Sequence, residues 1–250
     1  MTYFLDEYKL FAYSIPEILK NQEAKKMDGF KELKKEGFNE INSEENKIRP
    51  ITFKDYIGQE NLKNQLSVFI KAAQMKNKTL PHVLLFGPPG LGKTTLATII
   101  AHEMGTKIHY TSAPAIEKAA DLASLLLKLD EGDFLFIDEI HRLKIQTQEM
   151  LYPAMEDKVI DIAIQGGRES KLVRLPLKNF TLIGATTKPG LLSNPLRDRF
   201  SIQQQLKFYE LPELERIVKR TANIFELTIE LFLLKTIDTQ FEHTFLTITL

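Results

Sequence analysis

The chain has 250 residues, of which 43% are hydrophobic and 26% charged, enough apolar material for a buried core in one large or two smaller domains. Lys and Arg balance Asp and Glu at 33 each, so the overall charge lends no support to nucleic-acid binding. The chain contains no cysteine, which excludes disulfides, thiolate metal sites and cysteine nucleophiles, and no segment is apolar enough to span a membrane. We therefore expect a cytoplasmic protein without membrane contact.

The first 46 residues differ in composition from the rest of the chain. Apolar positions up to residue 19 could line one face of a helix, whereas residues 20–46 are rich in Lys, Glu and Asn. We expect residues 1–46 to form a poorly structured, partly helical extension. A docking tail for a partner is the second interpretation.

A helix is predicted over residues 60–76. Its apolar residues recur at helical spacing, so they should face the core. These residues are Leu62, Leu66, Phe69, Ile70 and Ala73.

A complete P-loop pattern, G-x-x-x-x-G-K-S/T, occupies residues 87–94 as GPPGLGKT. The continuous apolar run before it, residues 83–86, is typical of a buried parallel strand, and residues 95–104 have helical spacing. Backbone N–H groups at such a helix N-terminus favour a phosphate. Lys93 would contact the β- and γ-phosphates and Thr94 would bind Mg²⁺. The pattern predicts a binding site for a nucleoside triphosphate.

A second acidic motif follows a strand predicted at residues 108–111 and a helix predicted at residues 117–129. Four apolar residues, 134–137, lead into Asp138-Glu139, which is the Walker B arrangement of a buried strand ending in two carboxylates. Asp138 would hold Mg²⁺ directly or through water, and Glu139 could act as the general base on the attacking water.

A β-hairpin is predicted over residues 159–175, after a helix over residues 146–156, because period-two patterning surrounds a Gly-Gly pair. Such a projection indicates a partner or substrate contact, and a covered sheet edge is the alternative. The next predicted strand, residues 180–187, ends in Thr186-Thr187, which would place a hydroxyl near the γ-phosphate.

The segment after this strand contains Arg197-Asp198-Arg199. A surface cluster of this kind is usually only solvated charge. Its position after a nucleotide-binding core is also one from which a subunit could offer a guanidinium to the phosphates bound by its neighbour.

Together these segments resemble the RuvB family of AAA+ ATPases, the motors of Holliday-junction branch migration. The resemblance covers roughly residues 48–225. The matching segments are RP at 49–50, FKDYIGQ at 53–59, GPPGLGKTT at 87–95, FIDEIHRL at 136–143, AMED at 154–157, LIGATT at 182–187, PLRDRF at 195–200 and FY at 208–209.

The resemblance implies an α/β P-loop NTPase fold, with a central parallel sheet flanked by helices in a large ATPase domain at residues 47–205. It also implies a hexameric ring around duplex DNA that couples ATP hydrolysis to movement of Holliday-junction DNA in recombination and in the repair of DNA damage. Hairpin 159–175 would then bind the junction-binding partner RuvA.

Individual roles are implied residue by residue. Thr187 would sense the γ-phosphate, Arg199 would be the arginine finger acting on the next subunit, and Lys93, Asp138 and Glu139 would complete the catalytic set. ATP with Mg²⁺ would be bound by Ile48, Arg49, Gly87, Pro88, Gly90, Gly92, Lys93, Thr94, Thr95, Glu156, Asp157, Lys158, Arg199 and Tyr209, and the metal by Thr94 and Asp138.

The sequence departs from the family pattern after a helix expected at residues 211–225. Residues 226–250 contain no Pro, Gly or Arg, whereas the family continues with a lid arginine that senses nucleotide and a winged-helix domain that contacts DNA. We expect residues 206–250 to form a partial helical lid and the winged-helix domain to be absent. Two other interpretations stay open at this point: a clamp-loader-like ATPase, and a nucleotide-binding fragment without turnover.

Overall fold

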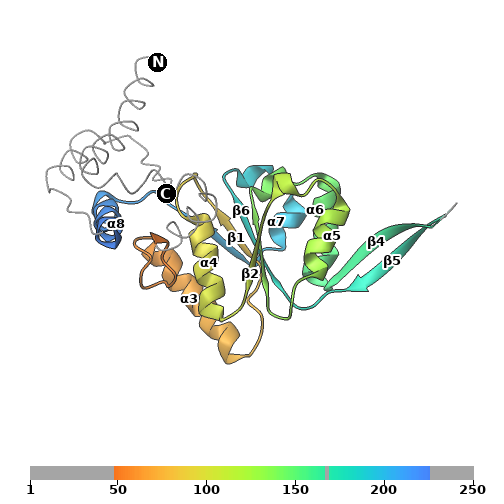
Figure 1. The fold of residues 1–250 in the computed structure, drawn as a ribbon, viewed down its shortest axis with the longest axis horizontal. Helices are drawn as coiled ribbons and strands as arrows, with labels where there is room; N and C mark the ends of the chain where they lie inside the picture. Colours follow the sequence, from red (N-terminus) through yellow and green to blue (C-terminus); the bar gives the residue numbers. More distant parts are fainter. Residues whose placement is uncertain (1–47, 167–168, 226–250) are drawn as a thin grey trace, which may run out of the picture. The chain divides into compact units, whose positions relative to one another are not determined.

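A computed structural model describes residues 48–166 and 169–225, drawn in colour in Figure 1. The extension expected at residues 1–46 and the end of the expected lid, residues 226–250, lie outside the described residues. The chain divides into two units between Ile48 and Arg49, and the positions of its parts relative to one another are not determined. The unit that begins at Arg49 contains every helix and strand described below, and the proposed domain limits stay a prediction.

The described residues form six α-helices and seven strands. The helices are α3 (Glu60–Met75), α4 (Lys93–Met104), α5 (Ala119–Leu127), α6 (Ile145–Glu156), α7 (Asn194–Asp198) and α8 (Leu211–Ile224). The strands are β1 (Val83–Phe86), β2 (Ile108–Ser112), β3 (Phe134–Asp138), β4 (Val159–Gly166), β5 (Glu169–Pro176), β6 (Thr181–Thr186) and β7 (Ile202–Gln205).

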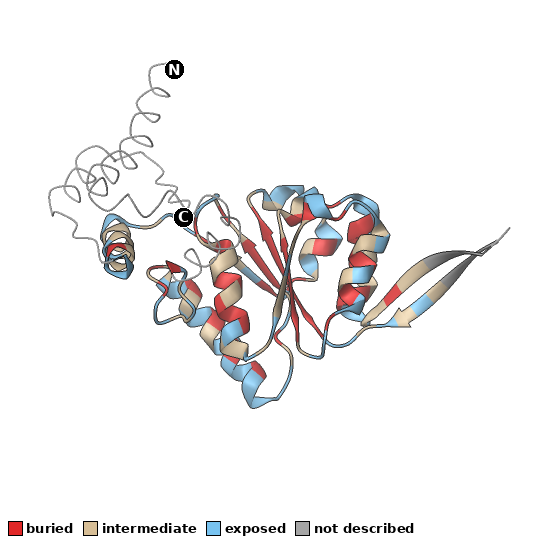
Figure 2. Cartoon of the chain, in the orientation of Figure 1, coloured by how far each residue is buried: buried red, intermediate tan, exposed pale blue. Residues whose placement is uncertain are grey.

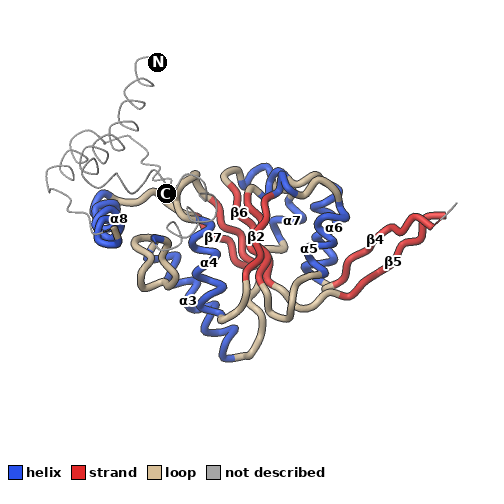
Figure 3. The backbone as a smooth tube through the Cα atoms, in the orientation of Figure 1, coloured by secondary structure: helices blue, strands red, loops and turns tan. Residues whose placement is uncertain are grey.

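Five strands form one parallel sheet, drawn in red at the centre of Figure 3. Their order is β2-β3-β6-β1-β7. The three inner strands, β3, β6 and β1, are almost entirely buried, which explains why their sequences are continuous apolar runs rather than alternating ones. This sheet confirms the predicted α/β class. Since all five strands run the same way, their carboxyl ends meet at one edge, and the P-loop and the acidic pair follow at that edge.

Helices cover both faces of the sheet, α3 and α4 on one face and α5, α6 and α7 on the other (Figure 1). The buried residues accordingly form two clusters, one on each side of the strands. Figure 2 shows buried residues in red on the strands and on the helices that cover them. The packing against β6 is close at Gly184, where an added Cβ would lie 2.9 Å from Cδ1 of Ile140 and 3.1 Å from Cζ of Phe200. A glycine here lets α7 and the segment after β3 approach the strand.

One residue predicted to be buried in the core is exposed. Phe69 in α3 is 39% exposed, whereas Leu62, Leu66, Ile70 and Ala73 are buried as expected. These four residues follow helical spacing by themselves, and Phe69 lies about 100° around the helix from Ile70, beyond the stripe that faces the sheet. Helix α4 also begins at Lys93, two residues earlier than expected, because the end of the P-loop is itself the first helical turn.

Strands β4 and β5 pair only with each other and form the predicted hairpin (Figure 1). The register runs from Val159 opposite Pro176 to Gly166 opposite Glu169. Near its base Arg174 donates two hydrogen bonds to the carboxylate of Asp161, at 2.8 and 2.9 Å. The hairpin therefore extends from the α/β core without adding a strand to the central sheet. In the part of the chain that the structure describes, no helix is both long and apolar enough to cross a membrane.

Candidate active site

The P-loop runs from the end of β1 to the start of α4. Its three glycines all have backbone angles that other residues rarely adopt, φ 149° at Gly87, φ 77° at Gly90 and φ 84° at Gly92. Two of them are also closely packed. A Cβ at Gly87 would lie 2.6 Å from the carbonyl oxygen of Leu206, and one at Gly92 would lie 3.1 Å from Oη of Tyr56. Both positions therefore require glycine for conformation and for space.

The first turn of α4 presents N–H groups of Lys93, Thr94 and Thr95, and its N-cap, Gly92, supplies no capping side chain. Free N–H groups and the helix dipole at this end favour an anion. Thr94 and Thr95 are half-buried, Pro88 is half-buried and Gly90 is exposed. A phosphate approaching the loop would meet backbone donors rather than apolar side chains, so this segment fits a polyphosphate.

Lys93 lies folded against the loop. Its side chain is buried, and Nζ donates to the carbonyl oxygens of Gly87 at 3.0 Å and Pro88 at 2.8 Å. Burial lowers the pKa of Lys93, and the carboxylates of Glu139 and Asp138 oppose this shift. The electrostatic coupling indicates that the acidic pair and the P-loop lysine share one site, as the motif spacing predicted.

The acidic pair stands at the end of β3. Asp138 is the last residue of the strand, and its Oδ1 accepts a hydrogen bond from the backbone N–H of Glu139 at 2.9 Å. Glu139 has a left-handed backbone with φ 48°. Such a conformation is uncommon for a residue with a side chain and costs on the order of 1–3 kcal/mol, so the surrounding contacts must hold it. This bend turns the Glu139 carboxylate towards the end of β6.

The carboxylate of Glu139 is contacted by Thr187 and His141. The hydroxyl of Thr187 lies 3.3 Å from Oε1 and 3.2 Å from Oε2, and the backbone N–H of Thr187 lies 3.5 Å from Oε2. Nδ1 of His141 lies 3.0 Å from Oε2 and 2.8 Å from the hydroxyl of Thr186. The two residues predicted to be the general base and the γ-phosphate sensor are thus in contact.

Tyr209 lies over the segment that precedes α3. Its hydroxyl donates to the carbonyl oxygen of Leu91 at 3.2 Å and to the hydroxyl of Tyr56 at 3.1 Å, and Tyr56 donates to the same carbonyl at 3.1 Å. Burial raises the pKa values of both tyrosines. A Cβ at Gly58 would lie 2.8 Å from the ring of Tyr209. These contacts hold the predicted nucleotide contact Tyr209 against the P-loop.

Arg199 lies at a second cluster, where α6 and α7 end. Its guanidinium donates to the carbonyl oxygen of Pro195 at 2.6 Å and to Oε2 of Glu156 at 3.1 Å, and it stacks 4.4 Å from the centroid of the Tyr152 ring. Its buried Nε has no hydrogen-bond acceptor among the described residues. An unsatisfied buried donor is costly, so this arrangement leaves Arg199 able to gain from a further partner.

The Arg199 cluster and the P-loop lie at opposite ends of β1. The N–H of Ile202, three residues after Arg199, donates to the carbonyl oxygen of His82, which precedes β1, whereas Gly87 follows this strand. Four residues of strand span about 13 Å. Arg199 therefore starts from the end of the sheet that is remote from the P-loop of its own chain.

The other predicted nucleotide contacts near α6 lie at this remote end too. Asp157 caps the end of α6, and Nζ of Lys158 lies 3.1 Å from Nε2 of His82 and 5.0 Å from the centroid of the Phe180 ring. The structure thus brings Glu156, Asp157 and Lys158 together but not to the P-loop of the same chain. Arg49 is exposed and Ile48 belongs to the other unit, so the nucleotide contacts expected of these two residues stay a prediction.

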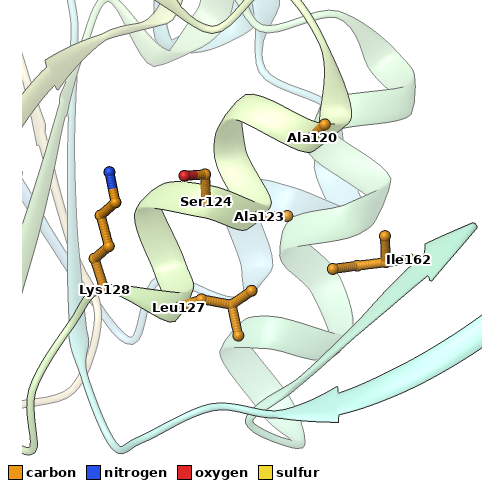
Figure 4. A pocket seen from close by; sticks show the side chains of 6 residues that line it. All are labelled: Ala120, Ala123, Ser124, Leu127, Lys128 and Ile162. Atoms are coloured by element: carbon orange, nitrogen blue, oxygen red, sulfur yellow. The ribbon is translucent and has the colours of Figure 1, made fainter. Parts of the chain in front are cut away.

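A cavity of about 360 Å³ lies between α5 and the base of β4 (Figure 4). It is remote in the fold from the P-loop, and it opens beside the hairpin. Its lining residues are Ala120, Ala123, Ser124, Leu127, Lys128 and Ile162.

The sequence patterns gave no role to His141 and Tyr56, which lie in the matching segments, and did not include Tyr152. Each contacts a predicted site residue, Glu139, Tyr209 and Arg199 respectively. The first lies three residues after Asp138, and the carboxyl ends of neighbouring parallel strands meet at one edge. That rule alone does not place His141 beside the threonines that end β6, because it does not give the order of the strands in the sheet.

The fold and the site define the class of protein. A parallel sheet in which β6 separates the P-loop strand from the acidic strand, with the polar end of β6 beside the general-base candidate, is the arrangement of an AAA+ P-loop NTPase. Residues 48–206 match the family described as "Holliday junction DNA helicase RuvB P-loop domain". The chain belongs to the RuvB family.

Relatives found by sequence similarity carry the name of the same family. The "Holliday junction branch migration complex subunit RuvB" of Streptococcus thermophilus is 57% identical over 185 residues, which are 74% of this chain and 56% of the relative. The protein of the same name from Lactococcus lactis subsp. cremoris is 54% identical over 197 residues, 79% of this chain and 59% of the relative. The chain thus spans less than two thirds of the length of these relatives.

Solved structures give the same result. The Thermotoga maritima RuvB Holliday junction branch migration motor is 49% identical and superposes with a TM-score of 0.65, over 74% of this chain and 57% of that chain. A single-residue variant of the Thermotoga maritima protein reaches a TM-score of 0.69 at 48% identity, over 76% of this chain and 59% of that chain.

Proposed function

We propose that this chain is an ATP-hydrolysing subunit of a Holliday-junction branch-migration motor, with each active site shared between two subunits of a hexameric ring. One observation carries the proposal. Lys93, Asp138 and Glu139 lie at one edge of the sheet, whereas Arg199 lies at the other, about 13 Å of strand away. The guanidinium of Arg199 so placed cannot complete the nucleotide site of its own chain. A neighbouring subunit that presents this edge could complete that site with its own Arg199.

The substrate is MgATP, and the residues present fit it. Lys93 and the loop N–H groups bind the phosphates, and Mg²⁺, which prefers oxygen donors, would take the hydroxyl of Thr94 and the carboxylate of Asp138. The bound ion supplies charge neutralisation at the phosphate oxygens. Glu139 accepts the proton of the attacking water, Thr187 donates its hydroxyl to the γ-phosphate, and Arg199 of the adjacent subunit stabilises charge in the transition state.

The partners follow from the relatives, which are named as subunits of a branch migration complex. Hairpin 159–175 would bind RuvA, since it projects from the core and its strands satisfy only each other. The cavity beside it, between α5 and Ile162, offers apolar area for the same partner. The DNA substrate would be the Holliday junction, and the site of action the cytoplasm. The names of these relatives favour this reading over a clamp loader.

Mixing two inactive variants tests the shared site. In Arg199→Ala the P-loop is intact but the finger is lost, which typically lowers turnover by about 10³–10⁵ while nucleotide binding survives. In Lys93→Ala the finger is intact but phosphate binding is lost. We expect each variant alone to be inactive, and an equimolar mixture to regain a substantial fraction of wild-type ATPase activity, because Lys93→Ala subunits supply fingers to Arg199→Ala sites.

The matched control is Arg197→Ala, which removes the arginine two residues before Arg199, in α7. It should leave turnover within about threefold of wild type, since surface substitutions away from a site have small effects. Near-normal turnover of Arg199→Ala, or no recovery in the mixture, would contradict the shared site. A wild-type chain that binds ATP without turnover would instead be an inert nucleotide-binding fragment.

A further inference from the structure

The general-base candidate Glu139 has a neighbour to which no role has been given. His141 is nearly buried, with 9% of its side chain exposed, whereas the Glu139 side chain is 31% exposed. Nδ1 of His141 faces two acceptors at once, Oε2 of Glu139 at 3.0 Å and the hydroxyl oxygen of Thr186 at 2.8 Å. Thr186 is fully buried and follows Gly184 on the strand beside β3. This imidazole is therefore held between the ends of two adjacent strands.

The contacts at Nδ1 are best satisfied when this nitrogen carries the proton. The hydroxyl oxygen of Thr186 already accepts the backbone N–H of Lys188 at 3.0 Å, so it is oriented by the chain itself. If Nδ1 of His141 lacked a proton, its lone pair would face an ionised carboxylate oxygen at 3.0 Å, which is repulsive. A protonated Nδ1 instead donates to Glu139, and this N–H···O⁻ bond is of the charge-assisted kind.

The two carboxylate oxygens of Glu139 have different partners. Oε2 receives three contacts, from His141 and from both the hydroxyl, at 3.2 Å, and the backbone N–H of Thr187, whereas Oε1 receives only the Thr187 hydroxyl among the contacts the structure describes, at 3.3 Å. If Thr187 turns its hydroxyl to the γ-phosphate, as proposed above, Oε1 is released as a proton acceptor. The contact from His141 to Oε2 does not depend on that turn.

We infer that His141 is the positioning residue for the general base: its Nδ1–H holds Oε2 of Glu139 so that Oε1 faces the attacking water once Thr187 has turned to the substrate. This inference deepens the proposed function and rests on it. His141 does not touch the substrate, so it acts only through Glu139. Holding the left-handed backbone of Glu139 in place is the second consequence of the same contact.

Two substitutions in the full chain separate hydrogen bonding from packing. His141→Asn keeps a side-chain N–H close to the position of Nδ1, and His141→Leu keeps similar bulk without a donor. We expect His141→Leu to lower kcat by about 10- to 100-fold, part of the general-base contribution, while KM for ATP changes little. His141→Asn should recover kcat to within about threefold of wild type.

The matched control is a second histidine–carboxylate pair. Nε2 of His109, on the edge strand β2, lies 2.8 Å from Oδ2 of Asp133, remote from the P-loop edge. His109→Leu should leave kcat near the wild-type value. Equal kcat loss in His141→Asn and His141→Leu, or unchanged kcat in His141→Leu, would overturn the inference.

Crystal structures of the nucleotide-free variants give a readout that does not need turnover. The Glu139 carboxylate should keep its position in His141→Asn and leave Oε2's present place in His141→Leu, whereas an unmoved carboxylate in His141→Leu would overturn the inference. If the wild-type chain shows no ATPase activity, the proposed function fails, and this crystallographic comparison still decides the role of His141.

Discussion

At the base of the hairpin, the imidazole of His82 has its two nitrogens committed to different roles. Nδ1 accepts the backbone N–H of Leu182 at 2.8 Å, so in the neutral ring the proton lies on Nε2, 3.2 Å from the carbonyl oxygen of Met155. The ammonium of Lys158 lies 3.1 Å from the same Nε2. A second proton would meet a backbone donor at one nitrogen and add a cation beside Lys158, so the folded protein keeps His82 neutral.

This arrangement predicts an acid-sensitive fold. Burial, assisted by the charge of Lys158, lowers the pKa of His82 from 6.5 to about 4. Because the folded-state pKa lies below the unfolded one, the unfolded chain takes up the proton first. The stabilisation is complete above about pH 6.5 and is lost as the pH falls towards 4. From this residue alone, we expect the free energy of unfolding to drop by about 2 kcal/mol between pH 7 and pH 5.

Urea unfolding at both pH values, in wild type and in His82→Asn, measures the effect. The asparagine oxygen can still accept the N–H of Leu182 but does not titrate. The variant should be less stable at pH 7 and should show a smaller loss on acidification than the wild type. An identical loss in both proteins would show that His82 does not control the pH dependence.

At the residue scale, contacts between side chains that are far apart in the sequence could not be predicted. The roles of Lys93 and Asp138 could be proposed from spacing, because a strand, a loop and a helix in register leave few arrangements. The contact between His141 and Thr186 could not, because it joins the ends of β3 and β6, which are adjacent only through the strand order of the sheet. Local periodicity contains no information on that order.

At the scale of the elements, burial and length explain which strands and helices could be predicted from the sequence. Strands β1, β3 and β6 were predictable because both faces are buried, so their sequences are apolar throughout. The edge strand β7, with sequence IQQQ, buries only Ile202 and lacks such a run. Helix α7 has five residues and is too short to show periodicity. Both were missed for this physical reason.

The hairpin provides a prediction at this scale. Its strands satisfy only each other, so shortening it should leave the central sheet intact. We expect a variant in which Asn-Gly joins Asp161 directly to Arg174 to bind nucleotide as wild type does and to lose RuvA binding. The opposed pair Asp161–Arg174 is kept, and Asn-Gly supplies the tight turn that a two-residue connection requires.

Nucleotide titration and a RuvA pull-down measure the two properties of the shortened variant. A control with residues 162–173 intact but Asp161→Asn tests the ion pair at the base. Exposed pairs contribute about 0–1 kcal/mol, so this control should keep both properties. Loss of nucleotide binding on shortening would place the hairpin in the ATPase core, and retained RuvA binding would refute its role as the partner contact.

At the scale of the whole molecule, the sheet separates two clusters of charge. One edge gathers Lys93 with Asp138 and Glu139, and the other gathers Arg199 with Glu156. Because the strands are parallel, every loop that follows a strand lies at the first edge and every segment that precedes one lies at the second. In the ring proposed above, this topology would make each subunit carry half of two different sites.

This separation predicts how nucleotide binding stabilises each variant. A ligand that binds only the folded state adds about 2.7 kcal/mol at a concentration of 100 Kd, which for a chain of this size raises Tm by roughly 5–10 °C. At protein concentrations too low for ring assembly, a non-hydrolysable ATP analogue with Mg²⁺ should raise the Tm of wild type and of Arg199→Ala alike. In Lys93→Ala the shift should be abolished, because that ammonium is the cation at the phosphate edge.

Thermal unfolding monitored by intrinsic fluorescence or calorimetry measures the shifts. Equal loss of the shift in both variants would mean that Arg199 reaches the nucleotide of its own chain, which the length of β1 argues against.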